Sequence, residues 1–222
     1  MLEYSGGGYI VIDENDRHIK EVLCPENHKE IERELLFHSN PISNQCAMIR
    51  KSVIDQYKIS YPEEFSFSED FALWCECVGY TKFHNLNEPV AKYRVVKNST
   101  SRVASKGMGD CYTRIRKKLQ QRVLKLRYFF QIKEAIDTHN EVCITDIKNA
   151  EKELLVLLKQ YPSEDIIGMA KSVMKKALRK CRFSKEYCHF LWSSHLLKKM
   201  NIGMGFKISQ IIKFNHTAEE YL

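Results

Sequence analysis

The sequence predicts an α+β protein in two parts, residues 1–106 and 107–222. In the first part, short segments typical of strands and short helices alternate with turn residues. In the second part, apolar residues recur every three or four positions, which predicts a mainly helical subdomain. The charge differs as well, because the first part has 13 Lys and Arg against 16 Asp and Glu, whereas the second has 22 against 12. We therefore expect the two parts to have different roles.

The first part begins with a predicted β-hairpin, in which residues 9–12 and 17–23 flank the polar turn 13–16. The glycines at 6–8 are expected to be a flexible approach to the first strand, because no Gly-Lys-Ser/Thr phosphate motif follows them. The remaining predicted elements are a helix over 26–37, a strand turning into a short helix over 47–54, a helix from Ser68 to about Val78, and strands over 82–86 and 90–95.

The second part begins with a long amphipathic helix that is predicted to extend from residue 107 to residue 130. Turn residues separate it from later segments with the same helical periodicity. These segments predict further helices over 146–160, 164–181, 185–200 and 204–214.

Composition excludes several classes of protein. A hydrophobic content of 44% is enough for a folded core. No run approaches the roughly 20 apolar residues of a membrane-spanning helix, and the N-terminus lacks a secretory signal pattern, so a cytoplasmic location is expected. The eight cysteines form no Cys-x-x-Cys pair, which favours reduced, buried thiols over a zinc site.

Two adjacent carboxylates, Glu69 and Asp70, follow the predicted N-cap residue Ser68. Exposed backbone N–H groups and the helix dipole favour negative charge there, so a carboxylate is expected to stay ionised near neutral pH. An ionised carboxylate that faces a cleft can take the proton of a sugar hydroxyl as that oxygen attacks an anomeric carbon. The alternative is that both residues only stabilise the helix, and the two residues taken alone favour that alternative.

Motifs on both sides of these carboxylates favour the catalytic interpretation over helix stabilisation. The sequence has Asn-Pro-Ile at 40–42, Met-Ile-Arg-Lys-Ser at 48–52, Glu-Asp-Phe-Ala-Leu-Trp at 69–74, and Tyr-Arg at 93–94 with serines following. In this order the motifs resemble the second half of the family 2 glycosyltransferases of the GT-A fold. The resemblance covers about residues 4–102. It implies a partial GT-A-like α/β region in 1–106, the acceptor-side half of that domain, without the nucleotide-binding half.

The resemblance implies a role for each matching residue. Asp70 would be the catalytic base, and Glu69 would orient that base or an acceptor hydroxyl. The acceptor sugar would be bound by Trp74 and Asn40. The donor diphosphate would be bound by Tyr93, Arg94, Ser99 and Ser101, with the guanidinium of Arg94 neutralising charge on the leaving group. Two alternatives stay open, a core position for Trp74 and a structural salt bridge for Arg94.

The metal-binding motif of that family has no counterpart in the sequence. Family members carry an Asp-x-Asp upstream of the matching region, and no Asp-x-Asp occurs in this chain. They also often have a histidine at the positions of Asn44 and Val96. We therefore predict no metal site on this chain itself, and expect a divalent cation, Mg or Mn, only in a full-length enzyme.

Basic residues gather in the helical part. The simpler interpretation is a solvated helix face. The functional interpretation is attraction to an anionic surface, such as the cytoplasmic leaflet of a membrane, at roughly 1 kcal/mol per basic residue, with nucleic acid as the less favoured partner. The residues are Arg114, Arg116, Lys117, Lys118, Arg122, Lys125 and Arg127, followed later by Lys175, Lys176, Arg179, Lys180 and Arg182.

The residues and the resemblance together predict a glycosyltransferase, or the C-terminal fragment of one. It would transfer a sugar from a nucleotide sugar to a glycan or a lipid-linked acceptor with inversion, in the cytoplasm or at the inner face of the membrane. The alternative is a non-catalytic protein, either a decayed fragment or a basic helical module that binds nucleic acid or a membrane surface.

Overall fold

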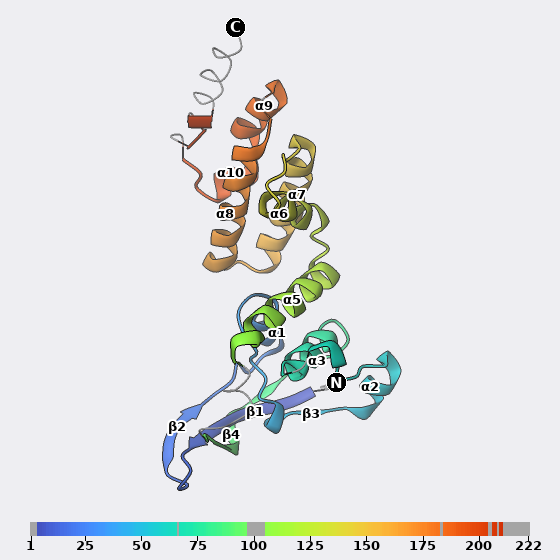
Figure 1. Cartoon of the computed structure of the whole chain (residues 1–222), viewed down its shortest axis with the longest axis vertical. Coiled ribbons are helices and arrows are strands. Elements are labelled where there is room, and N and C mark those ends of the chain that lie inside the picture. The colour runs from blue at the N-terminus through green and yellow to red at the C-terminus, as the bar shows by residue number, and fades with distance from the viewer. Residues whose placement is uncertain are drawn as a thin grey trace. The chain divides into compact units, whose positions relative to one another are not determined.

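The computed structural model describes residues 4–65, 67–96, 105–182, 184–203, 206–207 and 209–210 (Figure 1). It has a mixed α+β structure, as the sequence predicts. The chain divides into two compact units, Met1–Val123 and Leu124–Leu222. The boundary therefore lies after the first long helix, whereas the sequence placed it before that helix, at residue 106.

A small mixed sheet lies in the first unit (Figure 1). Asp13 stabilises the predicted hairpin turn, because its Oδ1 accepts hydrogen bonds from the backbone N–H groups of Asn15 and Arg17, both at 2.8 Å. The two strands predicted over 82–86 and 90–95 form a single strand in the structure. The central strand β1 (Tyr4–Ile12) pairs antiparallel with β2 (His18–Val22) and β3 (Met48–Ile49), and parallel with β4 (Asn85–Arg94).

The glycines at 6–8 are part of β1 and are closely packed, so the prediction of a flexible approach is wrong. A Cβ atom on Gly6 would lie 2.4 Å from Oδ1 of Asn85 and from the hydroxyl of Tyr4. A Cβ atom on Gly8 would lie 2.5 Å from the carbonyl oxygen of Val22, in the strand next to β1. Glycine is required at these positions because neighbouring atoms already occupy the space of a side chain.

The first unit also contains several helices. The helix α3 (Glu69–Cys77) contributes much of the core, since Phe71, Leu73 and Trp74 are all buried. Ser68 occupies the predicted N-cap position of α3, but its buried hydroxyl makes no capping hydrogen bond. The described helices are α1 (His28–Phe37), α2 (Lys51–Tyr57), α3 (Glu69–Cys77) and α5 (Ser105–Leu124), with short 3-10 turns η1 (Asn44–Cys46) and η2 (Glu63–Phe65).

Polar side chains bind α5 to the rest of the first unit. The guanidinium of Arg122 donates to the carbonyl oxygens of Cys75 at 2.7 Å and Val78 at 2.9 Å, which lie at the C-terminal end of α3. A cation is favourable there because the last carbonyls of a helix have no partner within the helix. Gln120 donates to the carbonyl of Leu36 at 2.6 Å. These bonds explain why α5 belongs to the first unit.

The helix predicted over 107–130 is two helices in the structure. α5 ends at Leu124, and α6 (Arg127–Asp137) begins after a break. At the break, Lys125 has a φ of 50°, a left-handed conformation that a helix interior does not contain. The apolar residues continue at helical spacing across the break, so periodicity alone does not reveal it.

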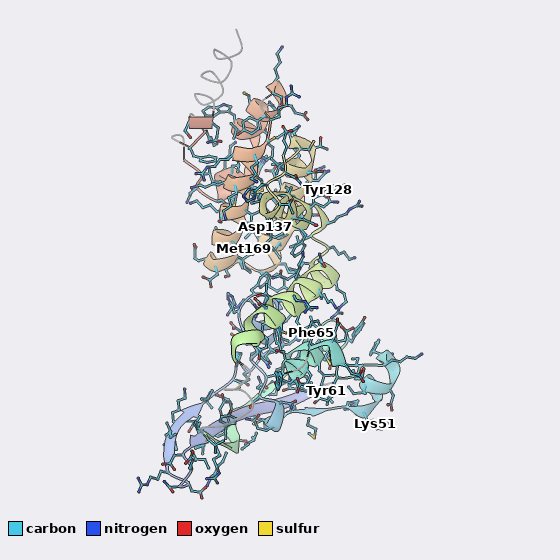
Figure 2. All side chains as sticks on the ribbon, in the orientation of Figure 1. Lys51, Tyr61, Phe65, Tyr128, Asp137 and Met169 are labelled. Atoms are coloured by element: carbon cyan, nitrogen blue, oxygen red, sulfur yellow. The ribbon has the colours of Figure 1, made fainter. Side chains whose placement is uncertain are left out.

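The second unit is a group of helices with a shared apolar core. The residues that contribute fully buried side chains include Ile147, Leu154, Ile166, Met174 and Leu191. The helix predicted over 185–200 is divided at Ser194, and the one predicted over 204–214 lies mostly outside the described residues. The helices are α6, α7 (Ile144–Gln160), α8 (Glu164–Lys180), α9 (Lys185–Ser193) and α10 (His195–Lys199), and Figure 2 labels Tyr128 and Asp137 in α6 and Met169 in α8.

A carboxylate of α7 caps the start of α6. Glu153 accepts hydrogen bonds from the backbone N–H groups of Tyr128 at 3.1 Å and Phe129 at 3.0 Å. These are two of the N–H groups that have no partner inside the helix, and the helix dipole also favours a negative charge at this end. Glu153 therefore links two helices of the second unit.

We expect Glu153→Ala to destabilise the second unit by about 1–2 kcal/mol, because two N–H groups lose a charged acceptor. The measurement is the free energy of unfolding in urea, followed by helical circular dichroism. Lys152→Ala is the matched control, since Lys152 is exposed on the same helix and its loss should change stability by less than about 0.5 kcal/mol. Equal stability of the two variants would show that the cap does not stabilise the unit.

Candidate active site

A groove in the first unit has a volume of about 520 Å³, which is within the range of small-molecule sites. Its walls come from both strands and helices, together with the loop 39–45 that follows α1. The side chains that matter most for its chemistry are Tyr9 of β1, Glu34 of α1, Asn40 of the loop, Asp70 of α3, Tyr93 of β4 and Tyr112 of α5.

Asp70, the predicted catalytic base, lies half-buried in the wall of this groove. It is in the first turn of α3, where its Oδ1 accepts a hydrogen bond from the N–H of Phe71 at 2.7 Å. Burial raises the pKa of Asp70 above its ordinary value; the N–H of Phe71 opposes that rise and the nearby charge of Glu69 adds to it. Burial therefore affects the pKa of Asp70 more than the helix N-terminus does, contrary to the expectation from the sequence. A raised pKa makes the ionised carboxylate a stronger base.

Glu69 lies beside Asp70 in the chain but not in the groove. Its side chain is exposed, and it is not among the residues that line the groove. Its described effect on the site is electrostatic, because its like charge contributes to the raised pKa of Asp70. The structure therefore gives Glu69 an indirect influence on the candidate base.

Tyr93 and Arg94, expected to act together on a diphosphate, lie on opposite faces of β4. Consecutive residues of a strand point to opposite sides of the sheet. Tyr93 lines the groove and contacts Tyr9 edge to face, with ring centroids 5.8 Å apart. Arg94 instead forms a salt bridge with Asp16 at 2.6 Å and donates to a carbonyl of the hairpin turn. For Arg94 the structure thus shows the structural salt bridge that the sequence left open.

The other residues implied by the resemblance have mixed positions. Trp74 is only 2% exposed and packs against the ring of Tyr4, which is the core position left open by the sequence. Asn40 lines the groove, and its Oδ1 accepts a hydrogen bond from the N–H of Ile42 at 3.2 Å. Ser99 and Ser101 lie outside the described residues. Of the two residues assigned to acceptor binding, Asn40 lines the groove and Trp74 does not.

Tyr112 is a groove residue that the sequence did not identify. Its ring packs against Phe71, with centroids 4.4 Å apart, and it lines the same groove as Asp70. Burial, and then the charge of Asp70, raise the pKa of Tyr112, which agrees with their closeness. In the sequence Tyr112 belongs to the apolar repeat of a long helix, so the pattern assigned it to a core. Tyr112 reaches the groove only because α5 packs against the other elements of the first unit.

Comparison with known proteins gives two relatives for this chain. No family model matches the sequence, and no solved structure matches it. An uncharacterized glycosyltransferase of Haemophilus influenzae is 24% identical over 176 residues, which are 79% of this chain and 52% of the relative. The O-antigen biosynthesis glycosyltransferase WbnJ of Escherichia coli is 36% identical over 107 residues, 46% of this chain and 40% of the relative.

Both relatives are named glycosyltransferases. The chain spans about half the length of these curated relatives.

Metal ligation finds no support in the described part of the chain. Across those residues, no group of three His, Cys, Asp or Glu side chains could hold a metal ion. The described side chains that line the groove include two carboxylates, of Glu34 and Asp70, and no histidine. No step of the chemistry is therefore assigned to a metal ion held by the described residues.

Several basic residues of α5 are bound to the first unit. Arg116 donates to the carbonyl of His38 at 3.0 Å, and Lys118 forms a salt bridge with Glu64 at 2.7 Å. Lys118 also lies over the ring of Phe65, which Figure 2 labels, at 4.9 Å from its centroid. Some of the basic residues that the sequence associated with a membrane surface therefore have partners within the first unit. Among the described helices, none is both long enough and apolar enough to span a bilayer.

Proposed function

We propose that this chain is the acceptor-side part of a family 2 glycosyltransferase of the GT-A fold. It takes part in the transfer of a sugar from a nucleotide sugar to a hydroxyl group of a glycan or lipid-linked acceptor, with inversion at the anomeric carbon. The observation on which this depends is the half-buried carboxylate of Asp70 in the wall of a sugar-sized groove. The names of the two relatives support the same general activity.

Asp70 is the general base of the proposed reaction. Its carboxylate accepts the proton of the acceptor hydroxyl as that oxygen attacks the anomeric carbon of the donor sugar. The new glycosidic bond forms while the bond to the nucleoside diphosphate breaks, so the diphosphate leaves with the bonding electrons. The hydrogen bond from the N–H of Phe71 to Oδ1 holds the carboxylate at the start of α3. Such fixed geometry supports attack in a single displacement step.

We assign binding of the nucleotide-sugar donor to residues other than those described in the groove. Arg94, the residue matched to diphosphate binding, is bound to the hairpin turn, and the described lining of the groove contains no cation. We propose that a nucleotide-binding half, together with a divalent cation, supplies the donor contacts. The name of WbnJ, an O-antigen biosynthesis enzyme, supports a cell-surface glycan as the acceptor for this chain as well.

The proposal is tested with a protein that joins this chain to a GT-A nucleotide-binding half. A panel of nucleotide sugars is offered with glycan acceptors, and released nucleoside diphosphate is measured. We expect release that depends on both the acceptor and the joined chain. The isolated chain is expected to bind nucleotide sugars weakly by calorimetry, because the donor contacts lie elsewhere. Tight, manganese-dependent binding by the chain alone would contradict this division of roles.

A further inference from the structure

We propose that the groove beside Asp70 accepts an uncharged sugar and rejects acidic sugars such as hexuronic or sialic acids. The inference rests on the proposed function, because it names the class of acceptor that the same groove takes. It is argued from the charges and hydrogen-bonding groups of the described residues that line the groove.

The described lining of the groove is acidic. It contains the carboxylates of Glu34 and Asp70, and none of its described members is Lys, Arg or His. Oε2 of Glu34 accepts a hydrogen bond from the hydroxyl of Ser39 at 2.9 Å, which holds this carboxylate at the edge of the loop. A ligand in the groove therefore meets two carboxylates and no cation among the described lining residues.

Two arginines, Arg33 and Arg116, interact with the carboxylate of Glu34 from outside the groove lining. Arg33 contacts the other oxygen of Glu34, Oε1, at 3.7 Å. Arg116 donates to the carbonyl of His38, and its guanidinium lies 5.5 Å from the ring centroid of Phe71. Neither guanidinium lines the groove. Recognition of a carboxylate ligand normally uses an arginine or lysine that points at the ligand, and the described lining offers none.

The remaining groups suit a neutral, hydroxyl-rich ligand. Tyr9, Tyr93 and Tyr112 supply phenol groups from three different elements, and Asn40 supplies an amide. Phenol and amide groups both donate and accept hydrogen bonds, as sugar hydroxyls do. The ring faces of the tyrosines also give apolar surface for the C–H face of a pyranose. A sugar carboxylate would gain none of the charge-assisted bonds that it needs and would be repelled by Glu34 and Asp70.

The test compares pairs of sugars that differ only at C6, where the neutral member has a hydroxymethyl group and the acidic member a carboxylate. Methyl glucoside is paired with methyl glucuronide, and methyl galactoside with methyl galacturonide, and each is titrated into the chain while amide chemical shifts are recorded. In at least one pair the neutral member should shift the amides around residues 39–45 and Asp70. The acidic member should bind at least about tenfold more weakly, and added salt should reduce that difference.

Substitution of Glu34 identifies the source of the discrimination. Glu34→Gln keeps an acceptor for the hydroxyl of Ser39 but removes one charge, so the preference for the neutral member should fall several-fold. Glu30→Gln is the matched control, because Glu30 lies on the same helix and is not in the groove lining, and it should leave the preference unchanged. Equal affinity for both members, a preference for the acidic member, or binding of neither pair would overturn the inference. Activity of the joined protein on an acidic acceptor would overturn it too, while leaving the proposed function intact.

Discussion

Asp70→Asn is expected to lower the rate of sugar transfer by about 10²–10⁴-fold, the usual contribution of a general base. Asparagine has nearly the same shape, and its Oδ1 can still accept the hydrogen bond from Phe71, so the groove should keep its form. It cannot take the proton of the acceptor hydroxyl. The loss should appear in kcat, with the KM for the donor nearly unchanged, because the donor does not bind through this carboxylate.

The measurement is steady-state transfer by the joined protein at several concentrations of donor. Glu69→Gln is the control, since it removes the same charge from the neighbouring exposed residue. The control should keep most of the activity and should shift the acid limb of the pH profile to lower pH, because the charge of Glu69 contributes to the raised pKa of Asp70. Undiminished turnover of Asp70→Asn would remove Asp70 from the reaction.

Stability against pH gives an independent check that Asp70→Asn is folded. The pKa of Asp70 is raised in the folded protein, so ionisation of this carboxyl is less favourable there than in the unfolded chain. The resulting destabilisation is complete above the folded pKa and is absent below the unfolded pKa. Asp70→Asn should therefore be more stable than the original protein at neutral pH, and this advantage should disappear as the pH falls below the ordinary range of aspartate. A less stable variant at neutral pH would contradict the burial of this charge.

Gly8→Ala is expected to destabilise the first unit by about 3 kcal/mol, the upper end of the usual range for an overfilled site. The added Cβ would lie 2.5 Å from the backbone carbonyl of Val22, and a backbone atom in a paired strand cannot move aside without loss of sheet hydrogen bonds. Amide hydrogen exchange in β1 and β2 measures the effect, because it reports the stability of that sheet directly.

Gly168→Ala is the matched control for the same substitution. Gly168 lies within α8, and a Cβ atom there meets nothing within 4 Å among the described surroundings. Alanine should stabilise the second unit by about 0.5–1 kcal/mol, because glycine loses more conformational freedom in a helix. Opposite effects are therefore expected from one chemical change. A mild effect of Gly8→Ala would show that β1 has room for a side chain.

The element types followed from local patterns in most of the chain. The hairpin turn around Asp13, the helix predicted over 26–37 and the helix predicted from Ser68 all form close to their expected positions. Asn27, for example, accepts a hydrogen bond from the N–H of Glu30 at 3.1 Å within its own helix. Such bonds join residues that are close in the sequence, which is why element types follow from local patterns.

Breaks and strand lengths were harder to predict. The left-handed residue Lys125 interrupts a continuous apolar pattern, and the strand β4 extends through Pro89 between two segments that looked separate. Proline and glycine within a strand normally indicate an interruption or a turn. In this chain the glycines of β1 are instead required by the close approach of neighbouring strands and side chains.

The sequence by itself determined the α+β class, the position of Asp70 at the start of a helix and the motif order that resembles a glycosyltransferase. Only the tertiary structure decided that Tyr112 joins Asp70 in the groove, that Trp74 is in the core and that Arg94 binds the hairpin turn. The physical reason is that a motif fixes which side chain is present, whereas its surroundings come from distant segments. The packing of α5 and the pairing of β1 with β4 bring those segments together. The spacing of residues along the chain does not predict these contacts.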